Sequence, residues 1–428
     1  DFDGHTITGT AWNASKGVDP VNVSAYDTDG DPANFSTAEQ DVVRDVWARV
    51  SEDYAPFDVD VTTQQPDQSA IDRSGASDEQ YGTRVLIDPD TWYQSGCGCG
   101  GVAYVGVYDN SSQHSYYQPA LVFTKGVGTG AKNIAEAAAH EAGHNVGLSH
   151  DGTASVGYYA GHGAWAPIMG VGYSKGISQW SKGEYTGANN KEDDFAVIGQ
   201  NGLALRADDH GNGTTDATAL TLGTSVKGIY ANDADVDTFR IDLAAGTFNF
   251  AATSAASGAD LDIKLQLLNS AGTVVATADP AAGQSNSATP TGLSASISRQ
   301  VTAGRYYLRV ENTGYGNPLN TGYSTYGSRG AYTVGGHHEH DDRHPRRLRQ
   351  AAHLAGGGQQ RLEQRVEGQA REDDRGGDDE AAHPSSLGAG WAVGGRGVLP
   401  RRMDRCASSS TVWSAWSSSS PCGRCSTT

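Results

Sequence analysis

Three histidines stand at spacings that suit a single metal ion. The stretch from residue 140 to residue 150 reads His-Glu-Ala-Gly-His-Asn-Val-Gly-Leu-Ser-His. On a helix, His140 and His144 lie one turn apart on the same face, so both imidazoles can reach one ion at about 2.0–2.1 Å. Gly147 can turn the chain sharply after the helix and bring His150 back as a third ligand. Three neutral histidines leave one coordination position open for water, which predicts a catalytic zinc site rather than a structural one.

Glu141 follows the first histidine and is the candidate catalytic residue. Its side chain is too short and differently directed to be a third ligand on that helix, but it is placed to touch a zinc-bound water as a general base. A bare His-Glu-x-x-His pattern also occurs by chance, on helices whose histidines face solvent. The glycine and the third histidine at fixed offsets make the longer pattern much more specific.

Strands and helices that alternate from residue 1 to about 205 are expected to position these side chains. Ser36 and Glu39 form a capping box that opens one long helix, and a second helix is predicted from about 132 to 146. A mixed sheet backed by two long helices fits this order, so residues 1–205 are predicted to be the zinc-binding catalytic domain. The apolar runs that predict strands are residues 1–9, 57–62, 84–87, 102–107 and 120–123.

A second domain is predicted at residues 216–335. This region is rich in Thr, Ser, Gly and Ala, and its apolar residues alternate in short runs such as 237–241, 261–265 and 307–310. Turn signals separate the runs. The pattern predicts a small antiparallel β-sandwich.

Residues 337–428 form a tail of unusual composition. They contain 13 Arg and no Lys, Ile, Asn, Phe or Tyr, although the chain has 19 Tyr in all. One interpretation is a disordered, low-complexity tail. The other is a GC-rich gene translated in the wrong frame, because codons that fit residues 337–342, read one base further on, specify a Thr/Ser linker of the kind expected after a secreted domain.

The overall composition limits the partners that the chain can take. A chain of 428 residues suits two or three domains, and a formal charge of −19 argues against nucleic acid or an anionic membrane surface. No apolar run approaches the 18 or so residues of a membrane span. The sequence starts at Asp1 without Met, so we expect a leader and any inhibitory propeptide to lie upstream. We expect a secreted, extracellular monomer.

Residues 140–150 resemble the zinc-binding stretch of the metzincin clan of zinc endopeptidases. Asp151 matches the reprolysin/adamalysin branch, in which an Asp usually follows the third histidine. Metzincins also have a Met-containing turn beneath the zinc, and Met169 lies in a matching stretch about nineteen residues after His150. Some metzincins place a Tyr two residues after that Met, whereas this chain has Val171 there.

Three further segments extend the resemblance. Residues 52–62 and 179–185 are similar to secreted bacterial reprolysin-like enzymes, and residues 216–335 to bacterial pre-peptidase C-terminal domains. The resemblance implies an α+β metzincin catalytic domain followed by an antiparallel β-sandwich. Tyr173, the tyrosine nearest to the expected position, could stabilise an oxyanion or form a wall of the pocket, and we favour the wall.

The activity that the resemblance implies is hydrolysis of peptide bonds in protein or peptide substrates by a zinc-activated water, with Glu141 as the general base. An edge strand should bind the peptide in extended form, either residues 102–107 or residues 120–123. The alternative function is a surface-binding or adhesion protein with a vestigial zinc domain, which the intact Glu141 disfavours. A zinc amidase acting on non-protein amides is disfavoured by the extended pattern.

Weaker signals lie outside the histidine stretch. Cys97 and Cys99 could form a soft metal site, a tight disulfide or two free thiols, and we favour a local disulfide in an oxidising compartment. The alternating Asp27, Asp29 and Asp31 resemble the start of a calcium loop, but a solvated turn is favoured. His162 could line the cleft. Four aspartates of the second domain could hold Ca²⁺, with surface charge as the default interpretation: Asp235, Asp237, Asp260 and Asp262.

Overall fold

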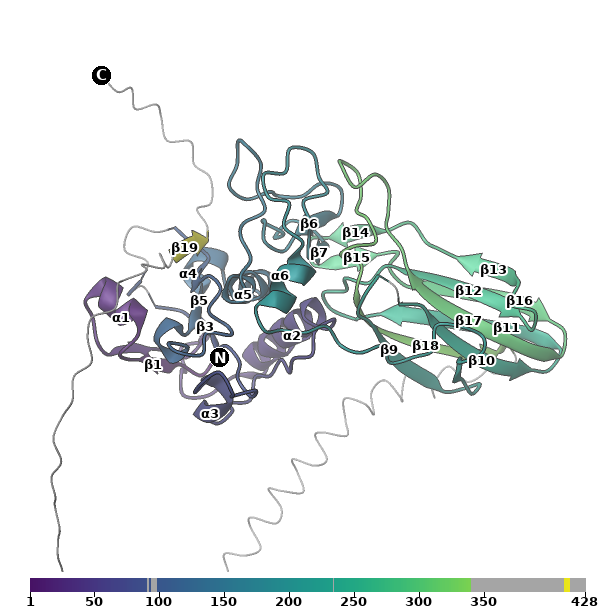
Figure 1. Cartoon of the computed structure of the whole chain (residues 1–428), viewed down its shortest axis with the longest axis horizontal. Coiled ribbons are helices and arrows are strands. Elements are labelled where there is room, and N and C mark those ends of the chain that lie inside the picture. Colours follow the sequence, from purple (N-terminus) through teal and green to yellow (C-terminus); the bar gives the residue numbers. More distant parts are fainter. Residues whose placement is uncertain (91, 94–97, 234, 340–411, 416–428) are drawn as a thin grey trace, which may run out of the picture. The chain divides into compact units, whose positions relative to one another are not determined.

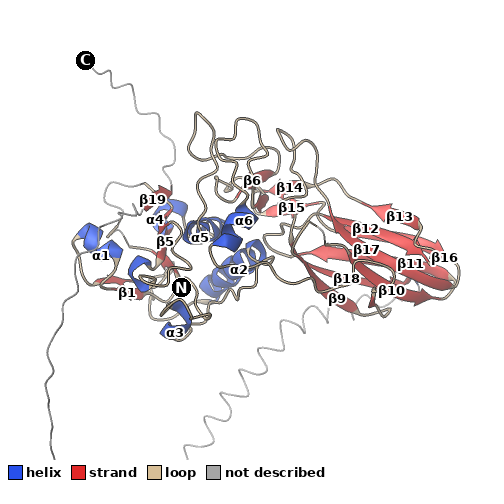
Figure 2. Ribbon diagram, in the orientation of Figure 1, coloured by secondary structure: helices blue, strands red, loops and turns tan. Residues whose placement is uncertain are grey.

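The structure is a computed structural model of the whole chain (Figure 1), and it describes residues 1–90, 92–93, 98–233, 235–339 and 412–415, the last of these by backbone only. Asp1–His338 belong to one compact unit. Figure 2 shows that helices are concentrated in the first part of the chain and strands in the second. None of the described helices is both long and apolar enough to cross a membrane.

Two long helices form the framework of the first domain. One is α2 (Thr37–Asp53), where the Ser36 side chain accepts a hydrogen bond from the Glu39 amide, as the capping box predicts. The other is α5 (Ala131–Asn145), which packs against α2 and against the central sheet. Both predicted helices are therefore confirmed within one residue or so. The shorter helices are α1 (Ala11–Lys16), α3 (Gln68–Ile71), η1 (Ser115–Tyr117), α4 (Thr124–Val127) and α6 (Asp194–Gln200).

The central sheet of this domain has the strand order β19-β4-β5-β3. β3 (Val85–Asp88) pairs in parallel with β5 (Ala120–Phe123), and β4 (Gly101–Tyr104) pairs antiparallel with β5, so the sheet is mixed. The outer side of β4 pairs antiparallel with β19 (Val412–Ala415). The proposal of 120–123 as an edge strand is wrong, because β5 has a neighbour on each side. The other candidate, 102–107, forms a strand only as far as Tyr104, and it too is flanked, by β5 and by β19. β1 (His5–Ile7) with β2 (Val21–Val23), and β6 (Trp165–Pro167) with β7 (Ile177–Gln179), form two further pairs.

One strand prediction in the first domain is wrong. Residues 57–62 contain no named strand, and within them only Phe57 forms an isolated bridge, to Leu205. Hydrogen bonds of this segment are made with the chain that leaves the domain: the Asp58 amide donates to the Ala204 carbonyl at 2.8 Å, and the Arg206 amide to the Pro56 carbonyl at 2.9 Å. The apolar alternation reflects burial beside that outgoing chain rather than membership of a sheet.

The second domain is a sandwich of two sheets with an apolar core between them. The five-stranded sheet has the order β13-β12-β17-β10-β8, and the four-stranded sheet has the order β16-β11-β18-β9. Their inward residues, among them Phe239, Phe250 and Leu308, are fully buried. The strands are β8 (Thr218–Ala219), β9 (Ser225–Tyr230), β10 (Asp237–Leu243), β11 (Gly246–Ser254), β12 (Ile263–Asn269), β13 (Val274–Ala278), β16 (Ala295–Val301), β17 (Gly304–Asn312) and β18 (Gly330–His338), with the pair β14 (Gly283–Asn286) and β15 (Thr289–Thr291) between β13 and β16.

The end of the sandwich lies slightly beyond the predicted boundary. β18 continues to His338, which pairs with Phe248 of β11. The last strand therefore enters the first residues of the tail that was predicted to begin at 337. Apart from Glu339 and β19, the rest of that tail lies outside the described residues, so whether it is in frame stays a sequence-based hypothesis.

Candidate metal centre

α5 presents two of the three histidines from one buried face. His140 is 4 % exposed and His144 is fully buried, and their ring centroids are 4.9 Å apart. The residues before them on the helix, Ala137 to Ala139, are small and buried, which lets α5 approach the sheet closely. The spacing of four residues therefore places both imidazoles toward one point, as expected for an α-helix.

Gly147 ends the helix and returns the chain to the site. Its φ of 99° is in the left-handed region that glycine adopts at low cost. The Leu148 amide donates to the Gly143 carbonyl at 3.0 Å, which satisfies a carbonyl at the end of the helix. His150 then lies against the other two rings: its Nε2 is 2.9 Å from Nε2 of His144, and its ring centroid is 5.2 Å from that of His140. One ligand atom from each of the three histidines lies within 4.8 Å of the others.

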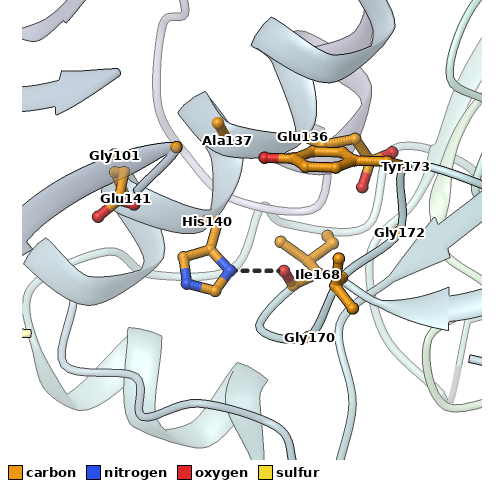
Figure 3. Close-up of a pocket in the computed structure, with 11 residues that line it drawn as sticks. Gly101, Glu136, Ala137, His140, Glu141, Ile168, Gly170, Gly172 and Tyr173 are labelled. Carbon is orange, nitrogen blue, oxygen red and sulfur yellow. Dashed lines mark hydrogen bonds between the residues drawn. The ribbon is translucent and has the colours of Figure 1, made fainter. Parts of the chain in front are cut away.

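Backbone carbonyls fix the orientation of two of these rings. Nδ1 of His140 is 2.9 Å from the Ile168 carbonyl, and Nδ1 of His144 is 2.8 Å from the Leu148 carbonyl. A carbonyl only accepts, so each Nδ1 carries the proton and each Nε2 keeps a lone pair for a metal. Figure 3 shows the first of these bonds.

Burial keeps the histidines neutral. It lowers the pKa of His140 to about 4 and that of His150 to about 3, and it also lowers the pKa of His144. Nε2 of His140 is buried and has no hydrogen-bond partner among the described residues. Nε2 of His144 and Nε2 of His150 lie within hydrogen-bond distance of each other, and a cation bound by the three rings would replace that contact. The donor set therefore fits zinc, which binds imidazole nitrogen in catalytic sites.

Glu141 lies beside this cluster, buried and without a hydrogen-bond partner among the described residues. It is fully buried, and neither carboxylate oxygen has a hydrogen-bond partner in the described part of the chain. Burial raises the pKa of its carboxyl group. Gly101 of β4 makes room for it, since a Cβ at this position would stand 2.5 Å from Glu141 Oε1. In Figure 3, Glu141 and Gly101 lie on one side of His140, and Glu136 and Tyr173 lie on the other.

The turn that contains Met169 packs against the histidine stretch. Met169 is fully buried in a cluster with Leu148 and Trp180. Its carbonyl accepts a hydrogen bond of 2.8 Å from the Asp151 amide, directly after the third histidine. Asp151 is itself buried and accepts a 3.3 Å hydrogen bond from the Tyr185 hydroxyl, and burial raises its pKa to about 7. These contacts join the chain just after His150 to the turn that contains Met169.

Two tyrosines border the site. Tyr173 lines the pocket beside His140 and Glu141, a position that fits either of its two predicted roles, and burial raises the pKa of its hydroxyl. Tyr158 was not considered from the sequence, yet its ring centroid is 4.3 Å from that of His150 and 6.1 Å from that of His140. It comes from the irregular loop after Asp151, whose course no local pattern indicates.

Other sequence candidates lie away from the histidines. His162 does not line this pocket, because Nε2 is 2.7 Å from the Gly322 carbonyl and Nδ1 is 2.8 Å from the Tyr159 hydroxyl. Cys99 is disulfide-bonded, whereas Cys97, the partner in our prediction, lies outside the described residues.

The four aspartates considered for calcium separate into two groups. Asp235 and Asp237 gather with Asp208, and one oxygen of each lies within 4.8 Å of the others. Asp260 instead lies against Asp53 of the first domain, and Asp262 accepts a 2.7 Å hydrogen bond from the Tyr323 hydroxyl.

A second acidic group lies near the start of α2. Asp27, Asp29 and Glu39 also have oxygens within 4.8 Å of one another. Several of their oxygens already accept hydrogen bonds, however. Glu39 accepts from Thr28 and Ser36, and Asp27 accepts from the amides of Asp29 and Gly30. This arrangement is a capped turn, as the sequence favoured.

Two family models match the chain. Residues 61–181 match that of metallo-peptidase family M12, reprolysin type, and residues 235–312 match that of the bacterial pre-peptidase C-terminal domain. Among solved structures, the chain is similar to the pre-peptidase C-terminal domain of collagenase from Bacillus anthracis, with 17% identity over 31% of this chain and 97% of that one, at a TM-score of 0.20. It is also similar to Aeromonas hydrophila PliG, a periplasmic inhibitor of g-type lysozyme, with 8% identity over 28% and 94%, at a TM-score of 0.19. No curated protein matches the chain.

Proposed function

The chain carries a domain of metallo-peptidase family M12 followed by a bacterial pre-peptidase C-terminal domain, and from this premise we propose that it is a secreted zinc-dependent endopeptidase. The family match indicates a metal-dependent protease with protein substrates. The finer assignments are our own: zinc as the metal, His140, His144 and His150 as its ligands, and Glu141 as the general base.

One observation carries this proposal. Three neutral imidazoles, two of them oriented by backbone carbonyls, gather beside a fully buried carboxyl group that has no partner among the described residues. A buried carboxyl group without a hydrogen bond costs stability, so its position needs a functional reason. Bound by these histidines, zinc would supply a Lewis acid that acidifies water and polarises a carbonyl group.

Glu141 then has the task of moving a proton. Its carboxylate takes the proton of the attacking water and delivers it to the amine that leaves. Burial favours the neutral acid after that transfer. A side chain at position 101 would collide with the Glu141 carboxylate, so Gly101 lets that carboxylate take its place beside β4.

β4 is the strand that we propose for substrate binding. Gly101 lines the pocket beside His140 and Glu141, and the outer edge of β4 pairs antiparallel with β19, from Tyr104 opposite Val412 to Gly101 opposite Ala415. An edge that accepts one extended segment can accept another, through the same backbone hydrogen bonds. A substrate would replace β19 at this edge.

The test is the variant Glu141→Gln in the full chain, assayed on casein. We expect casein cleavage to fall by about 10²–10⁴-fold, the contribution of a general base, while one equivalent of zinc stays bound. Glu79→Gln is the matched control, because Glu79 is an exposed glutamate of the same domain. Full activity of Glu141→Gln would remove Glu141 from the mechanism. Absence of casein cleavage by the wild-type protein, with zinc bound, would favour the adhesion protein instead.

We also propose a hard-cation site in the sandwich, with Ca²⁺ as its ion. Asp235 and Asp237 are 1 % and 0 % exposed, and one oxygen of each, Oδ1, has no hydrogen-bond partner in the described residues. Their other oxygens accept from the Ala231 amide and the Tyr332 hydroxyl, which fixes the two carboxyl groups. Together with Asp208 they offer the oxygen ligands that calcium prefers. The calcium titration in the Discussion tests this site.

Secretion and a monomeric state complete the proposal. The acidic surface and the pre-peptidase C-terminal domain support secretion, and we expect casein-cleaving activity in the medium of an expressing culture rather than inside its cells. We expect the mass of a monomer in solution. A stable dimer by light scattering would contradict that part.

A further inference from the structure

The loop from residue 168 to residue 176 forms one wall of the pocket beside the histidines. Ile168, Gly170, Val171, Gly172 and Tyr173 line that pocket together with His140 and Glu141. The loop begins directly after β6 and ends directly before β7, and these two strands pair in parallel. The position of the wall therefore depends on what holds β6 and β7.

Both strands are held by the sandwich domain. Trp165 of β6 and Ile177 of β7 are 5 % and 0 % exposed and belong to one buried apolar cluster with sandwich residues. The cluster is therefore shared between the domains, and its burial disfavours separation of the two by the usual hydrophobic cost. Its buried members from the first domain are Trp165, Ile177 and Tyr185, and those from the sandwich are Ala259, Ala282, Leu293 and Tyr323.

A chain of hydrogen bonds connects the sandwich with His140. The Asp260 carbonyl accepts from Nε2 of Gln179 at 2.5 Å, in a buried position. The Gln179 carbonyl accepts from the Ile168 amide at 2.9 Å. The Ile168 carbonyl in turn lies 2.9 Å from Nδ1 of His140. The group that orients this histidine is thus itself fixed by a strand that the sandwich binds.

Gln284 of β14 fixes the other end of the loop. Its Oε1 accepts a hydrogen bond of 2.6 Å from the Gly176 amide, and its Nε2 donates to the Ser174 carbonyl at 3.3 Å. Gly176 is buried, whereas Gln284 is exposed, so replacing the Gln284 side chain disturbs no core. One side-chain amide from the sandwich therefore closes the loop one residue after Tyr173.

We propose that the sandwich holds one wall of the substrate cleft in place and that Gln284 is a positioning residue for the 168–176 loop. This inference rests on the proposed peptidase function. The sandwich holds β6 and β7, Gln284 sets the conformation of residues 174–176, and Tyr173 thereby keeps its place in the wall. A domain that served only to attach the enzyme to a surface would need none of these contacts.

The test compares Gln284→Ala and Gln284→Glu with the wild-type full chain. Gln300→Ala is the matched control, because Gln300 is an exposed glutamine on β16. For a quenched peptide substrate, Gln284→Ala should raise KM by about threefold to tenfold, the effect of one or two net hydrogen bonds, with kcat within about twofold and zinc content unchanged. Gln284→Glu keeps the acceptor for the Gly176 amide but loses the donor. Its KM should therefore lie between that of the wild type and that of Gln284→Ala.

Hydrogen exchange gives a second measurement that does not depend on catalysis. The amide of Gly176 should exchange faster in Gln284→Ala than in the wild-type protein and in Gln300→Ala. A lower melting temperature with unchanged KM and unchanged exchange would overturn the inference and leave Gln284 a purely structural residue. If the wild-type chain cleaves no peptide, the proposed function fails, and faster Gly176 exchange in Gln284→Ala would still support the positioning role.

Discussion

The histidine cluster at the end of α5 and the aspartate cluster of the sandwich each contain two buried side chains, but these respond to burial in opposite ways. Burial lowers the pKa of His140 to about 4, so the imidazole is neutral, whereas it raises the pKa of Asp237 to about 8, so its ionised form is disfavoured. In the absence of an ion, the first site holds uncharged lone pairs. The second site holds two buried carboxyl groups, Asp235 and Asp237, beside the exposed Asp208.

This difference predicts what each metal does for the protein. Removing an ion from neutral nitrogen ligands leaves little electrostatic stress, so the first metal should matter mainly for chemistry. Removing an ion from desolvated carboxylates leaves groups that must either take up protons or repel one another in a poor solvent, so the second metal should matter mainly for stability. Two experiments test this contrast, and a third tests another buried carboxyl group, Glu52; they are given in order of decreasing effect.

The largest effect should come from the histidine site. His144→Ala should lower peptide cleavage by about 10³-fold or more, since the ion that activates water is lost. A chelator selective for zinc over calcium, such as 1,10-phenanthroline, should do the same to the wild-type protein. In the second case the protein should lose the stabilisation that the bound ion gives to the folded state, yet it should stay folded, because neutral histidines remain. His5→Ala is the control, and a collapse of the fold on zinc removal would contradict the contrast.

Calcium should give the next largest effect, on stability alone. At a concentration about 100 times the dissociation constant, Ca²⁺ should raise the free energy of unfolding by about 2.7 kcal/mol. Asp237→Asn should abolish this response, yet be as stable as wild type or more stable in calcium-free buffer, because it removes a carboxyl group whose charge is desolvated. Differential scanning calorimetry with and without EGTA measures both.

The control for that experiment is Asp279→Asn, an exposed aspartate of the same domain. It should respond to calcium as the wild-type protein does. A calcium response that survives in Asp237→Asn would show that the ion binds elsewhere.

The smallest effect should be a pH dependence of the free energy of unfolding. Its source is a carboxyl group at the boundary between the domains. Glu52 is buried, both of its oxygens accept from the Ala331 amide of β18, and burial raises its pKa to about 8. The folded pKa lies above the unfolded value, so this group's contribution is full below about pH 4.5 and is lost as the pH rises through about 8. Between pH 6 and pH 8 the loss should be about 2 kcal/mol.

Glu52→Gln should flatten that slope while keeping an acceptor for Ala331. Burial also raises the pKa of Asp53 and Asp260 nearby, so part of the slope should remain in this variant. Urea titrations of the chelated protein at pH 6, 7 and 8 measure the effect without interference from metal binding. Equal slopes in wild type and Glu52→Gln would exclude Glu52 as their source.

The features that the sequence predicted well are those that a short segment determines. A helix with histidines four apart, and a glycine after it, places three imidazoles together with little help from the rest of the chain. β5 was likewise predicted with its observed bounds, because four consecutive buried residues are a local signal. Its position inside the sheet was not predicted, since strand order depends on partners far away in the sequence.

The features that the sequence missed depend on residues that are distant along the chain. Tyr158 reaches His150 through an irregular loop, and Gln284 reaches Gly176 across more than a hundred residues. Neither contact leaves a periodic pattern or a motif. Asp260 shows the same limit. Its carboxyl group suggested a calcium ligand from the sequence, but the fold places it against Asp53.

The stretch at which the chain leaves the first domain, residues 204–206, has a consequence for its exposure to proteolysis. Its backbone is paired with residues 56–58, and the Arg206 side chain donates to the carbonyls of Ala55 and Val59 at 3.0 and 2.8 Å. An endopeptidase cuts chain that can enter its cleft in extended form, and a segment fastened at this many points must first be detached. Residues 204–206 are thereby less open to proteolysis than an unpaired segment would be, for as long as the first domain is folded.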